Sequence, residues 1–178
     1  MSGVMTFYRF APLGDESADA GDVAESLASL RDRLHAAAEA GNLKGTILLA
    51  TEGMNGTLSG EQADLEGFAA VLRAVPGFAA MPFKYSVANE GNPVFYRLKV
   101  RIKPEIVALG QPEVKPSERT GTHVDAQTWN QLLGDENLLV IDTRNDYEIG
   151  IGTFPGAVSP GTRSFKQFPE YVATLDPQ

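Results

Sequence analysis

The stretch GTILLATEGMNGTL, residues 45–58, decides the expected fold of the first part of the chain. Its opening run, GTILLA, is short and mostly apolar, and is typical of a buried strand. The sequence Glu52-Gly53-Met54-Asn55-Gly56 that follows predicts a tight turn, because Asn and Gly readily supply the positive φ angles that a hairpin needs. Thr57 and Leu58 then form a short second strand. The stretch therefore predicts a β-hairpin.

A helix is predicted on each side of this hairpin. After it, Ser59 and Gln62 form a capping box, apolar residues follow at helical spacing, and Pro76 ends the helix. Before it, Asp22 stands at the N-cap of a helix whose apolar stripe runs on to a stop at Gly41.

Three further segments complete the first domain as strands: VMTFYRF at 4–10, and the runs at 83–87 and 95–102. The order is then strand, helix, strand, strand, helix and strands. This split βαβ order predicts an α+β ferredoxin-like (acylphosphatase-like) domain, an antiparallel sheet with both helices on one face.

A second domain is expected after a linker. Residues 110–124 (GQPEVKPSERTGTHV) combine prolines, glycines and mixed charges without periodicity, as linkers do. We therefore place a ferredoxin-like domain at 1–109, a linker at 110–124 and a second domain at 125–178. Asp125 is the expected N-cap of a short helix, and LLVI at 138–141 lacks polar alternation, which predicts a parallel strand covered on both faces.

The rest of the second domain contains a glycine-rich loop and a helical stretch at 168–175. A parallel sheet needs several strands, and only one convincing strand is present. We therefore expect an incomplete α/β domain.

Composition restricts the possible chemistry. The chain has 178 residues, a formal charge of −8 and no cysteine. The negative charge argues against nucleic-acid binding over the whole surface but allows a local basic patch. Without cysteine, disulfides, thiolate metal sites and thiol nucleophiles are impossible in this sequence. No signal peptide or bilayer-length apolar run is visible, so a cytoplasmic protein is expected.

Several segments together resemble one enzyme family. LLVIDTRNDYEIGIGTFPGAVSP at 138–160 looks like the first strand and following loop of a rhodanese domain. TEGMNGTLSG at 51–60, FYRLKVRIKPEIVALG at 95–110 and the stretch 125–133 are similar to the rhodanese-domain tRNA uridine hydroxylases.

The resemblance implies an oxidoreductase that hydroxylates carbon 5 of the wobble uridine of tRNA with molecular oxygen as co-substrate. It also implies a catalytic cysteine in a loop after the next strand, which has no position in this sequence. We therefore expect a truncated rhodanese-like portion and an inactive fragment. A rhodanese-type sulfurtransferase fragment and a non-catalytic RNA- or protein-binding module remain alternatives.

Four cations alternate with apolar residues along one predicted strand: Arg97, Lys99, Arg101 and Lys103. A period of two puts the cations on one face and the apolar side chains on the other. The stripe is either a set of phosphate contacts for tRNA or the solvated face of a sheet. Both interpretations stay open.

Two further groups are candidate site residues. Glu52 and Asn55 could line a substrate groove, or could serve the turn alone. Asp142 and Arg144 stand at the carboxyl end of a predicted parallel strand, where α/β sites gather, and could support an active site through an ion pair that includes Glu148.

No metal site is expected from the residues, because the two histidines, His35 and His123, lack metal-ligand spacing with other residues, and no cofactor can be identified from the sequence. The expected partner, by resemblance, is tRNA. Neither a membrane nor DNA is expected as a partner.

Overall fold

The computed structural model describes residues 2–13, 20–87, 94–111 and 113–175. The chain divides into two units. The first comprises Met1–Val107 with Lys115–Glu118, and the second comprises Ala108–Val114 with Arg119–Gln178.

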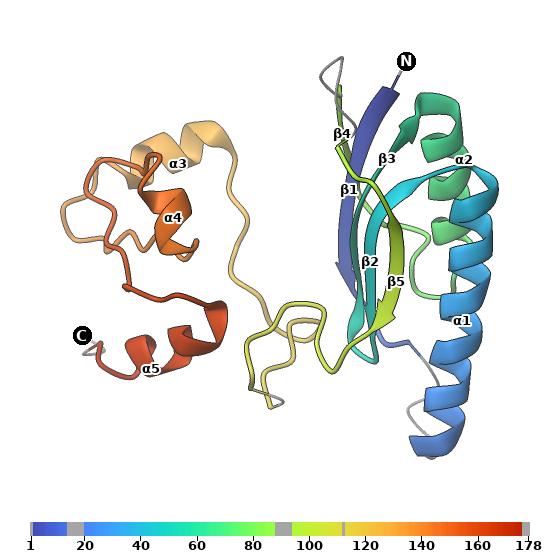
Figure 1. The fold of residues 1–178 in the computed structure, drawn as a ribbon. Coiled ribbons are helices and arrows are strands. Elements are labelled where there is room, and N and C mark those ends of the chain that lie inside the picture. The colour runs from blue at the N-terminus through green and yellow to red at the C-terminus, as the bar shows by residue number, and fades with distance from the viewer. Residues whose placement is uncertain (1, 14–19, 88–93, 112, 176–178) are drawn as a thin grey trace. The chain divides into compact units, whose positions relative to one another are not determined.

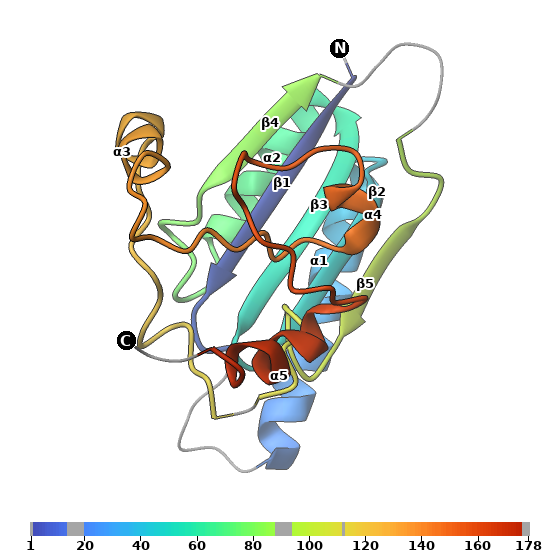
Figure 2. The ribbon, with the colours of Figure 1, turned by 90° about the vertical axis from the view of Figure 1, so that its left-hand side faces the viewer.

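The described residues of the first unit form a five-stranded sheet with two helices on one face (Figure 1). The strands are β1 (Ser2–Phe10), β2 (Lys44–Ala50), β3 (Gly53–Glu61), β4 (Phe83–Val87) and β5 (Leu98–Ile102). The helices are α1 (Ala20–Ala40) and α2 (Gln62–Arg73). The sheet order is β4-β1-β3-β2-β5, and Figure 2 shows the sheet with α1 and α2 behind it. The ferredoxin-like arrangement predicted for this part of the chain is thus confirmed.

The sheet is mixed, and the prediction of a fully antiparallel sheet was wrong. β1 runs antiparallel to β3 and β4, and β2 antiparallel to β3, whereas β5 pairs parallel with β2. The chain reverses its direction after β4 at one edge, so β5 reaches the opposite edge running in the direction of β2.

The hairpin turn is shorter than predicted. It occupies Thr51 and Glu52, and β3 already begins at Gly53. Gly53 has a φ of 151°, and a Cβ there would lie 2.2 Å from the carbonyl oxygen of Arg9. Asn55 lies inside β3 rather than at a positive-φ turn position. The central place of β3 between β1 and β2 satisfies its backbone and overrides the weak strand propensity of its glycines.

Both predicted helix starts need correction. α2 begins at Gln62 with Glu61 at the N-cap and no side-chain cap bond, because Ser59 is buried in the ladder of β3. The predicted Ser59 capping box is therefore absent. α1 begins at Ala20, ahead of the predicted N-cap Asp22, whose side chain lies outside the described residues.

The core of the first unit lies between the sheet and the helices. Buried side chains come from one face of the strands and from the facing stripes of both helices. They include Met5, Phe7, Ile47, Leu49, Met54, Leu58, Leu27, Leu34, Leu65, Phe68 and Leu72. Gly56 makes this packing possible, since a Cβ there would lie 2.5 Å from the Phe7 ring. The opposite face of the sheet carries no helix from the described residues of this unit (Figure 2).

The second unit contains short helices: α3 (Ala126–Leu132), α4 (Asp146–Ile149), a 3-10 helix (Phe165–Gln167) and α5 (Phe168–Val172). The predicted N-cap is confirmed, because the Asp125 carboxylate accepts a hydrogen bond from the Thr128 N–H at 2.8 Å. That bond holds the pKa of Asp125 below its usual value.

The predicted strand at 138–141 is not formed. Ile141 makes an isolated parallel bridge with Val158, and Leu138 and Leu139 are 46% and 55% exposed. Burial on both faces was therefore a wrong prediction. Among the described residues of the second unit, this segment has a backbone hydrogen-bonding partner on one side only. None of its apolar side chains is fully buried. The rhodanese-like assignment of this unit stays a prediction.

No helix in the described ranges is both long enough and apolar enough to cross a bilayer.

Candidate functional site

Two of the four predicted stripe cations lie within the edge strand β5. Lys99 and Arg101 are exposed, while Leu98 and Val100 between them pack against the core. The alternation therefore places the two cations on the face of the sheet away from the helices.

The other two cations of the stripe flank β5: Arg97 precedes it, because the strand begins at Leu98 rather than at the predicted residue 95, and Lys103 follows its last residue, Ile102. The backbones of both are tied to β2: the Arg97 carbonyl accepts from Gly45 N–H at 2.9 Å, and the Lys103 N–H donates to the Leu49 carbonyl at 2.8 Å. Their side chains are exposed.

A cation stands at each edge of the helix-free face. In register order, Lys99 of β5 lies beside Thr46, then Thr57, then Thr6, then Lys84 of β4. The hydroxyl oxygens of Thr6 and Thr57 are 3.4 Å apart. This row is therefore polar throughout, positive at both ends and without a carboxylate.

Glu52 and Asn55 hold the chain segment that follows β5. The Glu52 carboxylate accepts from the Ile106 N–H at 2.7 Å, and the Asn55 amide donates to the Ile106 carbonyl at 3.2 Å. Ile106 itself is buried. The pair thus has a defined structural role, and its part in a substrate groove stays a prediction.

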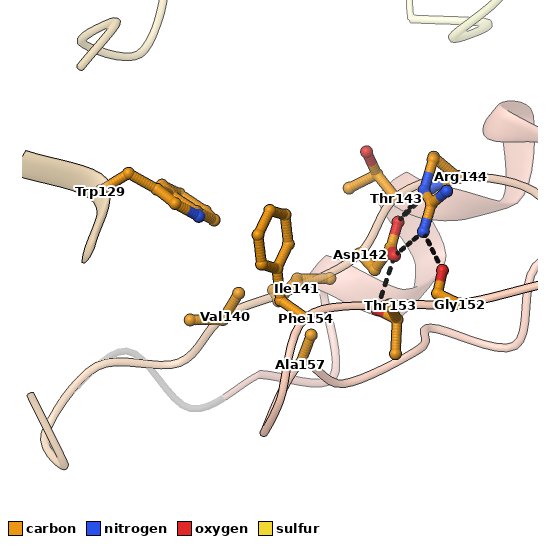
Figure 3. Close-up of a pocket in the computed structure, with 10 residues that line it drawn as sticks. All are labelled: Trp129, Val140, Ile141, Asp142, Thr143, Arg144, Gly152, Thr153, Phe154 and Ala157. Atoms are coloured by element: carbon orange, nitrogen blue, oxygen red, sulfur yellow. Dashed lines mark hydrogen bonds and ion pairs between the residues drawn. The ribbon is translucent and has the colours of Figure 1, made fainter. Parts of the chain in front are cut away.

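In the second unit, Asp142 is the centre of a hydrogen-bond network (Figure 3). The Arg144 guanidinium approaches it with two donors, Nε to Oδ1 at 3.0 Å and Nη2 to Oδ2 at 2.6 Å, and the Arg144 backbone N–H donates to Oδ1 at 3.2 Å. The Thr153 hydroxyl donates to Oδ2 at 2.7 Å. Arg144 Nη2 also donates to the Gly152 carbonyl at 2.7 Å. The network ties the segment after the Ile141 bridge to the loop at Gly152 and Thr153.

These contacts shift the pKa of Asp142 and the pKa of Arg144. Hydrogen bonds from Arg144 and Thr153 hold the pKa of Asp142 far below its usual value. The bond with Asp142 raises the pKa of Arg144 in turn. Both groups therefore stay charged at neutral pH.

Glu148 does not make the predicted ion pair with Arg144. Its carboxylate accepts from the backbone and side-chain N–H groups of Asn145 at 3.2 and 2.9 Å and completes the capping box of α4. It occupies the third position of that helix, which turns it toward the N-cap.

A pocket of about 480 Å³ lies next to this network. Trp129 and Phe154 form its aromatic side, with ring centroids 5.3 Å apart in an edge-to-face arrangement, and Asp142 and Arg144 form its polar side (Figure 3). The indole Nε1 of Trp129 is buried and has no hydrogen-bond partner in the described part of the chain. Thr153 and the pocket role of Trp129 were not predicted, because they depend on contacts between segments far apart in sequence.

Among the described residues, no three His, Asp or Glu side chains gather as a metal-binding group.

The sequence and the fold were compared with protein families, with curated proteins and with solved structures. The family described as UPF0176 acylphosphatase like domain matches residues 2–106. A tRNA uridine(34) hydroxylase of Synechocystis sp. is 47% identical over 98% of this chain and 59% of its own length. That of Agrobacterium fabrum is 47% identical over 81% of this chain and 45% of its own length. The chain thus spans roughly half of the curated relatives that it matches. A solved acylphosphatase from Bacillus subtilis is 17% identical, with a TM-score of 0.38 over 57% of this chain and 99% of its own.

Proposed function

We propose, on the premise that this chain belongs to the UPF0176 acylphosphatase-like family, that it is part of a tRNA uridine(34) hydroxylase whose first unit holds the tRNA. The two hydroxylases named above share nearly half of their aligned residues with it. In the whole enzyme the reaction is the oxygen-dependent hydroxylation of the wobble uridine.

The observation that carries the tRNA-binding role is the cationic stripe on the helix-free face. The chain as a whole has 15 Lys and Arg against 23 Asp and Glu, so its average surface repels RNA. Lys99 and Arg101 nevertheless stand exposed on β5, with Lys84 at the far edge of the same face. A local concentration of cations is what a polyanion requires, since each phosphate contact releases bound counterions.

Asp142 and Arg144 are assigned a supporting role in the second unit of the same enzyme. Their ion pair fixes the loop at Gly152 beside the pocket, and the lowered pKa makes the Asp142 carboxylate a weak base. They position the backbone rather than carry out the reaction.

The test is tRNA binding by the double variant Lys99→Ser/Arg101→Ser. Loss of two phosphate contacts should weaken binding and reduce the slope of log K against log salt by about 1.5 to 2. The affinity is measured by fluorescence anisotropy with labelled tRNA over a series of salt concentrations.

The matched control is Arg31→Ser/Arg33→Ser on α1, which removes the same charge from the helix layer. It should leave the salt slope of the unmodified protein nearly unchanged. An identical slope in both double variants would refute the proposed role of β5.

A further inference from the structure

Tyr8 is an exposed aromatic residue on the helix-free face, near the end of β1 and just beyond its pairing with β4. Its neighbours in sequence along β1, Phe7 and Arg9, point to the helix side: Phe7 is in the core, and the Arg9 guanidinium donates to the carbonyls of Gly77 and Ala80. Tyr8 therefore lies on the opposite face, and it is 46% exposed. The Phe10 ring meets it edge-to-face, with centroids 6.4 Å apart. The ring is thus supported at one edge and open to solvent.

The Tyr8 ring and a cation of β5 belong to one row across the sheet. Tyr8 pairs with Asn55, Asn55 with Leu48, and Leu48 with Arg101. Three strand spacings separate the two ends of this row, about 14 Å. A ligand that contacts both must therefore extend across the sheet.

A second row of the same face offers hydrogen bonds and positive charge. The neighbouring row carries the Thr6, Thr57 and Thr46 hydroxyls between Lys84 and Lys99. The carboxylate on this face of β3 is Glu61, in its last residue, which pairs with Ser2 at the end of the strand away from Tyr8.

We infer that the helix-free face of the first unit binds unpaired nucleotides of RNA, with a base stacked on Tyr8 and the backbone phosphates on the cations of β5. This inference rests on the proposed function and names the part of the tRNA that this face would take, a single-stranded loop or end.

The geometry favours unpaired over paired RNA. In an A-form helix the bases are stacked on each other and their flat faces are closed to a side chain, whereas unpaired bases can lie on an aromatic ring. A duplex could use the cations of β5 but not Tyr8. An exposed ring in the same row as a phosphate-binding cation is what single-strand binding requires.

The experiment compares two probes on the full chain. One is a labelled single-stranded RNA of about eight nucleotides without self-complementarity, within the usual site size for such surfaces. The other is a blunt RNA duplex that is long enough to stay fully paired over the whole salt series. Tyr8→Ala should weaken binding of the single strand by about five- to a hundredfold. Its salt slope and its affinity for the duplex should stay as in the unmodified protein.

Tyr85→Ala is the matched control. Tyr85 is 43% exposed on the adjacent strand β4, but it faces the helix side, 6.4 Å from the Phe83 ring. It should bind both probes as the unmodified protein does. Tyr8→Phe keeps the flat ring and should retain single-strand binding, and a thermal melt of each variant confirms that it folds.

Equal binding by Tyr8→Ala and Tyr85→Ala, or an equal loss of single strand and duplex in Tyr8→Ala, would overturn the inference. If tRNA binding still responds to Lys99→Ser/Arg101→Ser in that case, the proposed function stands and the stacking surface alone is refuted. If that double variant has no effect either, both are refuted.

Discussion

We expect the charge of Asp142 to make the stability of the second unit sensitive to acid. Its pKa is lowered in the folded chain, so its contribution to stability is fully present above the ordinary aspartate pKa of about 3.9 and is lost as pH falls below it. Trp129, the single tryptophan of the sequence, lies in the same pocket and reports on this unit by fluorescence. We expect the denaturant midpoint of Trp129 fluorescence to fall between about pH 5 and pH 2.5.

In Asp142→Asn the denaturant midpoint should already be lower at pH 7. The fall of this midpoint between about pH 5 and pH 2.5 should be absent from the variant. Asp146→Asn removes an exposed carboxylate from the nearby helix α4 and serves as the control. An acid response of Asp142→Asn equal to that of Asp146→Asn would contradict the stabilising role of the ion pair.

At the residue scale, the sequence predicted the Asp142–Arg144 ion pair but not the other contacts around it. Asp142 and Arg144 do form an ion pair, because a spacing of two residues after an extended segment lets them meet. Glu148 was predicted to join them, but the local preference of the third helical residue for the N-cap directs it to Asn145. Thr153 comes from a loop eleven residues away from Asp142, and no local pattern reveals that contact.

At the scale of an element, β3 depends on its glycines. Gly53 combines a φ of 151° with a carbonyl oxygen 2.2 Å from where a Cβ would lie, and that oxygen belongs to the backbone of β1. Gly53→Ala should therefore lower the free energy of unfolding of the first unit by about 1–3 kcal/mol or more. The measurement is urea unfolding followed by far-UV circular dichroism.

Gly67→Ala is the contrasting control on α2, where a Cβ would meet no described atom within 4 Å apart from its chain neighbours and the surrounding backbone of its own helix. It should raise the same free energy by about 0.5–1 kcal/mol, because alanine favours the helix over glycine. Equal effects of the two substitutions would mean that the backbone at Gly53 is not strained as described.

The elements that the sequence predicted well are those with local signals. The Asp125 cap and the helical spacing of Leu65 and Phe68 lie within a few residues of what they determine. The length of β3 and the parallel pairing of β5 with β2 were missed, because both depend on neighbours far apart in sequence. The segment 138–141 shows the converse: its apolar composition is that of a buried strand, but only Val158 pairs with it in the described structure.

At the scale of the whole chain, the two units differ in how their apolar residues are buried. The described core cluster lies entirely in the first unit, so opening of the first unit exposes far more apolar surface. We expect the Gly45 amide, bonded to the Arg97 carbonyl at 2.9 Å, to exchange at least about a hundredfold more slowly than the Asp142 amide.

The Asp142 amide is bonded to the Val158 carbonyl at 3.0 Å, so the comparison is between two hydrogen-bonded amides and measures local opening. Native-state hydrogen exchange of the full chain by NMR gives both rates. Similar rates would show that the two units open together.

The stripe on β5 has a consequence for the protein's behaviour at high concentration. β4 and β5 are the edges of the sheet, and in the described structure each pairs with a neighbour on one side only. The unpaired N–H and C=O groups of an edge strand can bond to a strand of another copy of the protein. Charged residues such as Lys84, Lys99 and Arg101 oppose this pairing, because the like charges of two copies repel each other. We therefore expect the same cations that would attract RNA also to reduce aggregation, so a variant that lacks them should be handled in dilute solution.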